Sequence, residues 1–519
     1  MMCMKKRLFS LVLCVLMILS LPGIAYAEEQ PFWNYSTSGY TYLYQNENGG
    51  LTRVIVPISH QNEKIYIEDY DASLKLQTKR EIAGELSLFG CFFSGAQYNY
   101  MVFGQANPNE DDNAEVVRVV KYSKNWERLG HASVYGANTK TPFKSGSCSC
   151  AEAEGMLYIR TCHEMYKTSD NVNHQANMTL AVRESDMAVT YRGTRIATPS
   201  SGYVSHSFDQ YVITDHEGNV VCLDLGDAYP RAVVLTRYND KVGSEEAMGS
   251  NVSNVNIQEI SGKVGDNYTG VGIGGFAETV GGYVTAYAYN GANRNAAYSV
   301  YLAYTDKSSL NTRVVKIAES TPVSSVKLVP TGITGGYIFW IDDASKRVYY
   351  TSYAADGSIG EVHSANIGVD DVGVMTTKPI YYNGYVIWSE GIRTNIKSSS
   401  EYDIAVNFYL LNDGGVNTVT LPATYPYTRP IFQEYAPSTP QEVVYSDTDK
   451  PDISQFTALT PPVNMKVISD ASVVDVDGRY LGTISKGSNI GVTGQCPGYY
   501  QVNYGARRSF LPQNVLSSN

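Results

Sequence analysis

The chain has 519 residues with 51 acidic and 40 basic side chains, which gives a formal net charge of −11. This excess of negative charge repels nucleic-acid phosphates and anionic lipids, so composition argues against both as partners. The length exceeds what one small core needs, so we expect a large repeat domain and an accessory domain. Tyr is three times as common as Phe (42 against 14), and Tyr suits half-wet strand faces because its ring packs while its hydroxyl stays solvated.

Residues 1–27 predict a secretory signal peptide. Lys5-Lys6-Arg7 form a basic start, Leu8 to Leu21 form an apolar run, and Ala25-Tyr26-Ala27 form a small-x-small cleavage site. The alternative is a membrane anchor, but the run is short of the roughly 20 apolar residues that span a bilayer. No later segment predicts a membrane span. We therefore expect an exported, extracellular protein that contacts the cell wall non-covalently.

Residues 28–423 show period-two alternation broken by polar turns. A strand that ends in Tyr or an apolar residue and runs into a polar turn recurs at Tyr70-Asp71, Tyr122-Ser123, Val182-Arg183, Tyr304-Thr305, Tyr353-Ala354 and Leu411-Asn412, with a weaker instance at Leu223-Asp224. Most neighbours lie about 50 to 60 residues apart, the length of one four-stranded propeller blade.

The predicted fold class is therefore all-β, a β-propeller followed by a small barrel. Seven blades are favoured, with six or eight left open, at 40–84, 85–138, 139–197, 198–245, 246–321, 322–370 and 371–423. The alternative is a pair of β-sandwiches. A closed ring is preferred because radial repetition protects the edges of many short strands.

Residues 424–462 are rich in proline and predict a semi-rigid linker. Residues 463–519 contain short strands and Gly turns, among them Asp477-Gly478-Arg479-Tyr480, Tyr499-Tyr500-Gln501-Val502 and Phe510-Leu511-Pro512. This segment resembles bacterial SH3-type domains, and the resemblance implies a small barrel used for cell-wall or peptide contact. Val473-Val474-Asp475-Val476 stands where that family has an Arg-Ser-Gly-Pro-like run. The repeat region resembles β-propellers only in the spacing of its repeats.

Candidate ligand-binding residues lie in loops predicted to join the second and third strands of the blades. Such loops share one face of a ring, and long loops on a rigid scaffold commonly carry binding function. Among the loops is Asp215 to Asn219. The candidates are His60, Asp111, Asp112, His163, Glu164, His174, His216, Glu390 and Arg393. The alternative for each histidine is that it satisfies the hydrogen bonds of its own turn.

The cysteines are too sparse for a disulfide framework. Cys91 and Cys222 are expected to be buried thiols. For Cys148, Cys150 and Cys162, a disulfide from Cys162 to one of the other two is favoured over unpaired thiols and over a metal site. No metal or cofactor is predicted, and the acidic loop Asn107 to Glu115 lacks the glycine and spacing of a calcium loop.

Together these features favour an exported, envelope-associated binding protein. Its propeller face would bind a glycan, a peptide or another exported protein, and its SH3-like domain would aid localisation. One alternative is a propeller hydrolase, lyase or transferase that acts on polysaccharides or esters through an acid–base pair. The other is a platform for protein assembly. No catalytic residue is assigned, and binding is favoured over catalysis.

Overall fold

The structure is a computed structural model. It describes residues 41–56, 64–194, 207–228, 230–238, 252–319, 323–342, 345, 347–367, 377–398, 401–428, 451–469, 471–474, 476, 480–484, 486–502 and 509–518. The predicted signal peptide at 1–27 lies outside these ranges, as does most of the predicted linker.

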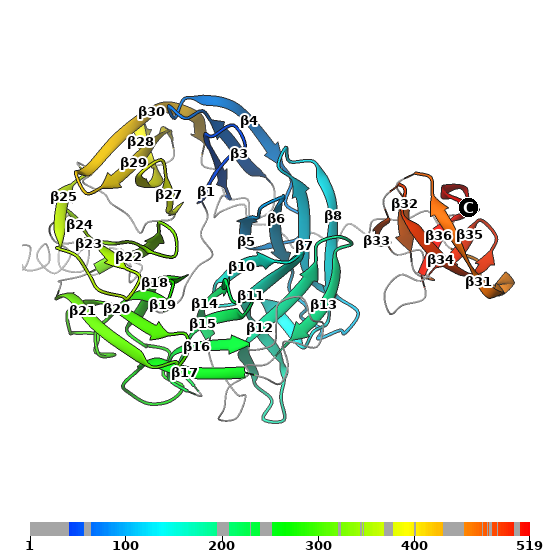
Figure 1. Cartoon of the computed structure of the whole chain (residues 1–519), viewed down its shortest axis with the longest axis horizontal. Coiled ribbons are helices and arrows are strands. Elements are labelled where there is room, and N and C mark those ends of the chain that lie inside the picture. Colours follow the sequence, from blue (N-terminus) through cyan, green and yellow to red (C-terminus); the bar gives the residue numbers. More distant parts are fainter. Residues whose placement is uncertain are drawn as a thin grey trace, which may run out of the picture.

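Seven sheets are arranged around one axis, and the successive strands of each blade pair antiparallel (Figure 1). The first three sheets contain β1 (Thr41–Gln45), β2 (Leu51–Ile55), β3 (Ile65–Tyr70) and β4 (Leu76–Ile82); β5 (Leu88–Ser94), β6 (Tyr98–Gly104), β7 (Glu115–Ser123) and β8 (Arg128–Tyr135); and β9 (Thr139–Pro142), β10 (Cys148–Ala153), β11 (Met156–Lys167), β12 (Asn173–Arg183) and β13 (Ala188–Gly193). The next two contain β14 (Ser207–Thr214), β15 (Val220–Gly226), β16 (Ala232–Tyr238) and β17 (Val252–Glu259); and β18 (Val271–Glu278), β19 (Gly282–Tyr289), β20 (Ser299–Asp306) and β21 (Thr312–Glu319). The last two contain β22 (Val323–Pro330), β23 (Gly335–Asp342), β24 (Arg347–Ala354) and β25 (His363–Asn366); and β27 (Ile380–Tyr382), β28 (Tyr385–Ser398), β29 (Glu401–Asn412) and β30 (Gly415–Thr428). The fold is a seven-bladed β-propeller, as the repeat predicts.

Each blade is apolar near its second strand and polar at its outer strand. The second strands β15 and β19 are buried along almost their whole length, because neighbouring blades cover both faces of the sheet. The side chains of the outer strands β4 and β21 are half-buried or exposed, and many are charged, since solvent covers the outward edge of each strand. Many tyrosines, including Tyr100, Tyr283 and Tyr287, are buried between blades rather than arrayed on a wet face.

The recurring polar turn joins the third strand of a blade to its fourth. In three of these turns an aspartate carboxylate accepts a backbone N–H two residues later: Asp71 from Ser73, Asp306 from Ser308, and Asp356 from Ser358. This local hydrogen bond favours a turn over continuation of the strand. The motif therefore recurs where the third strand of a blade ends.

The fourth blade departs from its predicted boundaries. Leu223-Asp224 lies inside β15 rather than in a turn, and β17, predicted to begin the fifth blade, is the outer strand of the fourth. The matching phrase in the sequence is Tyr238-Asn239-Asp240-Lys241, which resembles Tyr304-Thr305-Asp306-Lys307 and follows the end of β16. The blade count is therefore confirmed, while the boundary at 245 is wrong.

Asp224 has a structural role between blades. Its carboxylate receives two bonds from the fully buried Arg160 of β11, from Nε at 3.0 Å and from Nη2 at 2.5 Å. Arg160 also donates to the Thr179 hydroxyl. A buried guanidinium needs such partners, because an unpaired buried charge is strongly destabilising.

The ring closes between the seventh and first blades. Tyr70 and Phe408 pack edge to face with centroids 5.1 Å apart, within an apolar cluster that draws side chains from both blades. Arg53 Nε donates to Ser389 Oγ at 3.1 Å, and Tyr382 Oη donates to the Gly49 carbonyl at 2.8 Å. A short strand, β26 (Thr377–Lys378), adds to the first sheet in parallel with β1. Contacts between segments more than 300 residues apart therefore join the seventh blade to the first.

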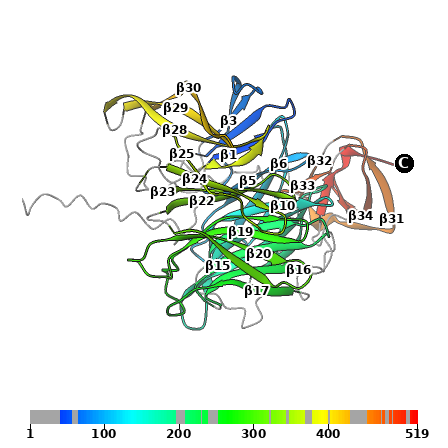
Figure 2. The ribbon, with the colours of Figure 1, turned by 60° about the vertical axis from the view of Figure 1, so that its left-hand side comes forward.

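Beyond the ring, a separate seven-stranded sheet contains β31 (Thr457–Val467), β32 (Ala471–Val474), β33 (Tyr480–Ile484), β34 (Asn489–Cys496), β35 (Tyr499–Val502), β36 (Ser509–Pro512) and β37 (Leu516–Ser518). Two short 3-10 helices accompany it, η2 (Ile453–Gln455) and η3 (Gln513–Val515). The sheet has its own apolar core, which includes Val473, Val492 and Leu511. Figures 1 and 2 show it beside the ring, where β33 contacts β8 of the second blade.

Both ends of the predicted linker are strand, since β30 runs to Thr428 and β31 starts at Thr457. Within the described ranges, no helical segment has the length and apolarity needed to cross a bilayer.

We predict that Phe408→Ala destabilises the propeller by about 3–5 kcal/mol, because it removes a fully buried ring from the closing seam and leaves a cavity. Urea-induced unfolding, followed by tryptophan fluorescence, measures the change. Tyr381→Ala is the matched control, since this aromatic residue of the same blade is 42% exposed and its loss should change stability little. Equal effects of the two substitutions would contradict the proposed importance of the seam.

Candidate functional site

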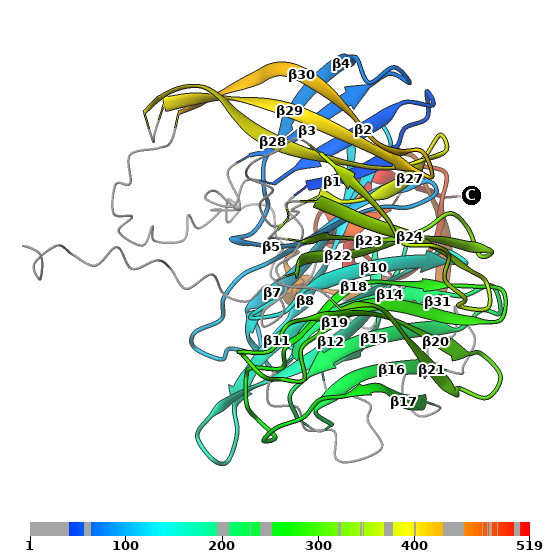
Figure 3. The same cartoon turned by 90° about the vertical axis from the view of Figure 1, so that its left-hand side faces the viewer.

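Loops that join second and third strands lie on one face of the ring. In the side view of Figure 3 the hairpin of β11 and β12 and that of β28 and β29 extend to the same side. The loops of the second and third blades are joined to each other there. Glu110 accepts hydrogen bonds from the Asn173 amide at 2.8 Å and from the Lys167 backbone N–H at 3.2 Å. These bonds and the charges of Lys140 and Lys167 hold the pKa of Glu110 below its usual value.

The acidic loop is organised by its own hydrogen bonds. Asn107 donates to the Asp111 carbonyl and to the Tyr166 hydroxyl, and the Asp111 carboxylate accepts from both the backbone and the side chain of Asn113. Asp112 is exposed and lies against Gly136. No group of three or more His, Cys, Asp or Glu side chains suited to a metal ion occurs among the described residues.

His163 lies inside the third blade and is completely buried. Its Nε2 is 3.2 Å from the Thr194 carbonyl oxygen and its Nδ1 is 2.7 Å from Thr139 Oγ1. A carbonyl can only accept, so Nε2 carries a proton. Burial lowers the pKa of His163 to about 4, so the ring is neutral at neutral pH. This histidine is a structural residue.

Glu164 and His174 have partners within their own blade. The Glu164 carboxylate accepts from Thr141 Oγ1 at 2.8 Å and from Lys144 Nζ at 3.0 Å. His174 Nε2 is 2.7 Å from the Asp170 carboxylate, and hydrogen bonds from Thr168 and His174 lower the pKa of Asp170 to about 2. Asp111, Asp112, Glu164 and His174 therefore share a region of the ring, but the contacts described serve to hold their loops.

His216 lies on the opposite face of the ring. The segment Asp215 to Asn219 joins the first and second strands of its blade, not the second and third as predicted. His216 Nδ1 is 2.7 Å from Glu278 Oε2, and Lys307 Nζ is 2.5 Å from the other oxygen of the same carboxylate. The prediction placed the fourth blade one strand too early, which also explains its wrong boundary at 245.

His60 lies outside the described residues, and only the backbone of Arg393, in β28, is described. Glu390, also in β28, is the one predicted residue that the structure places with charged groups from other blades near the axis. Lys327 of β22 is the common partner, since the charges of Asp209 of β14, Glu390 and Lys378 of β26 all act on it. We call these four residues the axial cluster.

The axial cluster combines two carboxylates with two ammonium groups from four different sheets. Burial lowers the pKa of Lys327, the carboxylates of Asp209 and Glu390 oppose that shift, and the charge of Lys378 adds to it. Asp209 is held in place, because Ser147 Oγ donates to its carboxylate at 2.7 Å. Lys378 is exposed, while Lys327 and Glu390 are half-buried. The arrangement can present hydrogen-bond donors and acceptors of both charges to one polar ligand.

Sequence reasoning missed three of the four members. Asp209, Lys327 and Lys378 lie on innermost strands, whereas the repeat pattern predicts binding residues in loops. The available signal was the charge itself. Lys327 stands in an otherwise uncharged strand, Val323–Pro330, where a charged side chain is unexpected in a strand packed between blades.

Cys162 does not form the predicted disulfide among the described residues. Its Sγ contacts the Lys144 carbonyl at 3.3 Å, and the sulfur is unbridged. Cys148 pairs in register with Thr161 and Cys150 with Ile159, so the pleat directs Cys162 to the opposite face of the sheet. Cys91 and Cys222 are buried, as expected.

No family model matches this chain, and no curated protein matches it. Among solved structures it is similar to a PL25 ulvan lyase, a polysaccharide lyase, at 11% identity over 65% of this chain and 83% of that one, with a TM-score of 0.41. It is also similar to the Aleuria aurantia lectin AAL, at 9% identity over 76% and 99% of the two chains, with a TM-score of 0.37. An ancestral GH74 enzyme matches at 9% identity over 92% and 87%, with a TM-score of 0.28. At such identities and TM-scores these likenesses carry no argument about function.

We predict that His163→Gln weakens the pH dependence of stability between pH 6.5 and 4. Because the folded pKa of about 4 lies below the unfolded value of about 6.5, the unfolded chain binds more protons in this window, and stability falls as the pH falls. Removing the group should reduce the slope by up to about 1.4 kcal/mol per pH unit. Urea unfolding at several pH values measures it.

His363→Gln, which replaces an exposed histidine, is the control and should leave the slope unchanged. Some slope should persist in His163→Gln, because burial and the charges of Arg118 and Arg128 also lower the pKa of His131 to about 4. An unaltered slope in His163→Gln would show that His163 binds a proton as readily in the folded protein as in the unfolded chain.

Proposed function

We propose that this protein is an exported binding protein that holds a polar ligand of the cell envelope at the axial cluster of its propeller. The observation that carries the proposal is the convergence of Asp209, Lys327, Lys378 and Glu390 from four sheets. Charged groups in a strand that packs between blades cost solvation, so a structure that needed only stability would favour apolar residues there.

The charge balance of the axial cluster indicates the ligand class. Two carboxylates accept hydrogen bonds from amines and hydroxyls, and two ammonium groups donate to carboxylates and hydroxyls. A glycan that carries peptide stems offers all of these groups. Export, which the leader sequence predicts, would expose the protein to such material, so cell-wall glycopeptide is the ligand we favour over a purely hydrophobic one.

The second element of the proposal is localisation by the C-terminal sheet. Residues 463–519 resemble bacterial SH3-type domains in sequence, and the strands from Thr457 onward form a sheet with a core separate from the blades. We propose that this sheet is an SH3-like barrel that contacts the cell wall, while the propeller reads the ligand.

A catalytic role is the second candidate. Lys327, whose pKa is lowered by burial, lies near two carboxylates, an arrangement that also suits proton transfer in a lyase or hydrolase. The two candidates differ in one outcome, since a binding protein leaves its ligand intact and an enzyme shortens or modifies it.

We predict that Lys327→Met raises the Kd for soluble peptidoglycan fragments by about tenfold or more, because it removes a half-buried charge from the axial cluster. Isothermal titration calorimetry measures the Kd, and mass spectrometry of the recovered fragments tests for cleavage. Lys316→Met, on the outer strand β21, is the matched control and should bind as the wild type does. Equal Kd values for the two variants would remove the axial cluster from the site, and shortened fragments would favour catalysis.

We predict that a chain ending at residue 450 is recovered on isolated cell walls several-fold less than the full chain. The truncated ring should keep its thermal transition, because the apolar clusters of the blades contain no residue of the C-terminal sheet. That sheet has a separate cluster of its own. Co-sedimentation with purified walls is the measurement. Equal recovery, with the thermal transition intact, would refute the localising role.

A further inference from the structure

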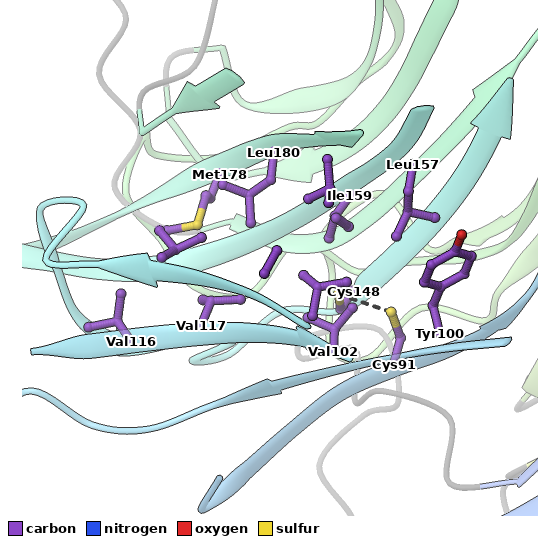
Figure 4. Packing of buried hydrophobic residues seen from close by; sticks show 14 of the residues in the cluster. Cys91, Tyr100, Val102, Val116, Val117, Cys148, Leu157, Ile159, Met178 and Leu180 are labelled. Carbon is purple, nitrogen blue, oxygen red and sulfur yellow. Dashed lines mark hydrogen bonds between the residues drawn. The ribbon is translucent and has the colours of Figure 1, made fainter. Parts of the chain in front are cut away.

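Three cysteine sulfurs meet at the inner edge of the seam between the second and third blades. Cys91 of β5 has its Sγ 3.1 Å from that of Cys148 of β10 (Figure 4). The Sγ of Cys150, also of β10, is 3.5 Å from that of Cys91. Both strands are the innermost of their sheets. None of the three sulfurs is bridged.

The pleat of β10 explains why two thiols face one. Cys148 and Cys150 are separated by one residue, so their side chains leave the same face of the strand. That face packs on the second blade, within the cluster that holds Val102, Leu157 and Tyr100. The apolar surroundings hold the sulfurs in place, which makes Cys91 a partner common to both.

The three thiols differ in access and in acidity. Cys91 and Cys148 are buried, while Cys150 is partly exposed. Burial opposes ionisation of Cys91, but hydrogen bonds with Cys148 and Cys150 and the charge of Lys378 lower its pKa to about 5. Burial raises the pKa of Cys148 and of Cys150. Cys91 is therefore the most acidic of the three thiols, and the thiolate is the form of a cysteine that attacks a disulfide.

We propose that Cys91, Cys148 and Cys150 form a thiol–disulfide exchange site, in which Cys91 is the common member of a disulfide that forms with either of the other two. The co-reactant is a small disulfide, RS–SR. Cys150, the member of the site that solvent reaches, first passes its proton to water, and its thiolate attacks RS–SR, which forms a mixed disulfide and releases RS⁻. The Cys91 thiolate then attacks the Cys150 sulfur, so that the Cys91–Cys150 bond forms and a second RS⁻ leaves. The two cysteines are oxidised and RS–SR is reduced to two thiols.

The same geometry lets the bond migrate. Cys148 is closer to Cys91 than Cys150 is, so the Cys148 sulfur can attack Cys91, form the Cys91–Cys148 bond and return Cys150 as a thiol. Either bond joins the inner strands of two blades and closes a loop that contains most of the second blade. Such a link restrains the unfolded chain and should raise the melting temperature.

The test uses the full secreted chain, reduced with dithiothreitol and then incubated with oxidised glutathione at neutral pH. Peptide mapping without reduction should identify a cross-link from Cys91 to Cys148 or Cys150, with the loss of two free thiols per molecule and a higher melting temperature. A cross-link that omits Cys91, or retention of all three thiols, would overturn the proposal.

Single substitutions distinguish the members of the site. Cys148→Ser should give only the Cys91–Cys150 link, and Cys150→Ser only the Cys91–Cys148 link, formed more slowly because the most exposed thiol is gone. Cys91→Ser should give neither. Cys222→Ser, at a buried cysteine of the fourth blade, is the matched control and should cross-link like the wild type. Because the mapping is done on the wild-type chain, the proposal is decided even if one variant fails to fold.

Discussion

Packing of the seventh blade against the first is the constraint on which the rest of this structure depends. Every other seam joins blades that are consecutive along the chain, but this one brings Tyr70 against Phe408 and Arg53 against Ser389, from the two ends of the repeat region. Burial of apolar surface there must offset the entropy of closing a very long loop. Once it does, the innermost strands of all blades face one axis, and β26 can add to the first sheet. The charged groups of four sheets become neighbours only as a result.

The closed ring also explains which polar residues serve structure and which remain for function. His163, Glu164 and Arg160 are buried or nearly so, and each has hydrogen-bond partners from its own or the adjacent blade. These hydrogen bonds offset the free energy of removing the three polar side chains from water, since a buried polar group without a partner is destabilising. The axial cluster differs, because its charges come from four sheets and three of them reach solvent: Lys378 is exposed, and Lys327 and Glu390 are half-buried. That difference is the physical reason for placing the ligand at the axis rather than at the loops.

The thiol group of Cys91, Cys148 and Cys150 stands next to the axial cluster, and Lys378 links the two. Its charge acts on Cys91 and Cys150 on one side and on Lys327 on the other. A change in the charge of Cys91 therefore alters the field at the proposed ligand site. The proposed ligand site and the proposed thiol site therefore share Lys378. This lysine lies in β26, the two-residue strand that pairs with β1.

The sequence by itself determined the all-β class, the seven repeats and most blade boundaries, because alternation and the Asp-capped turns are local signals set by residues close in the chain. It failed at the fourth blade, where Leu223-Asp224 imitates the turn and Asp224 instead pairs with Arg160 of another blade. Among the candidate residues whose side chains the structure describes, Glu390 alone lies in the axial cluster. Tertiary structure decided the partners of Glu390, the burial of His163 and the meeting of Cys91 with Cys148, since each depends on strands that become neighbours only when sheets pack face to face around an axis.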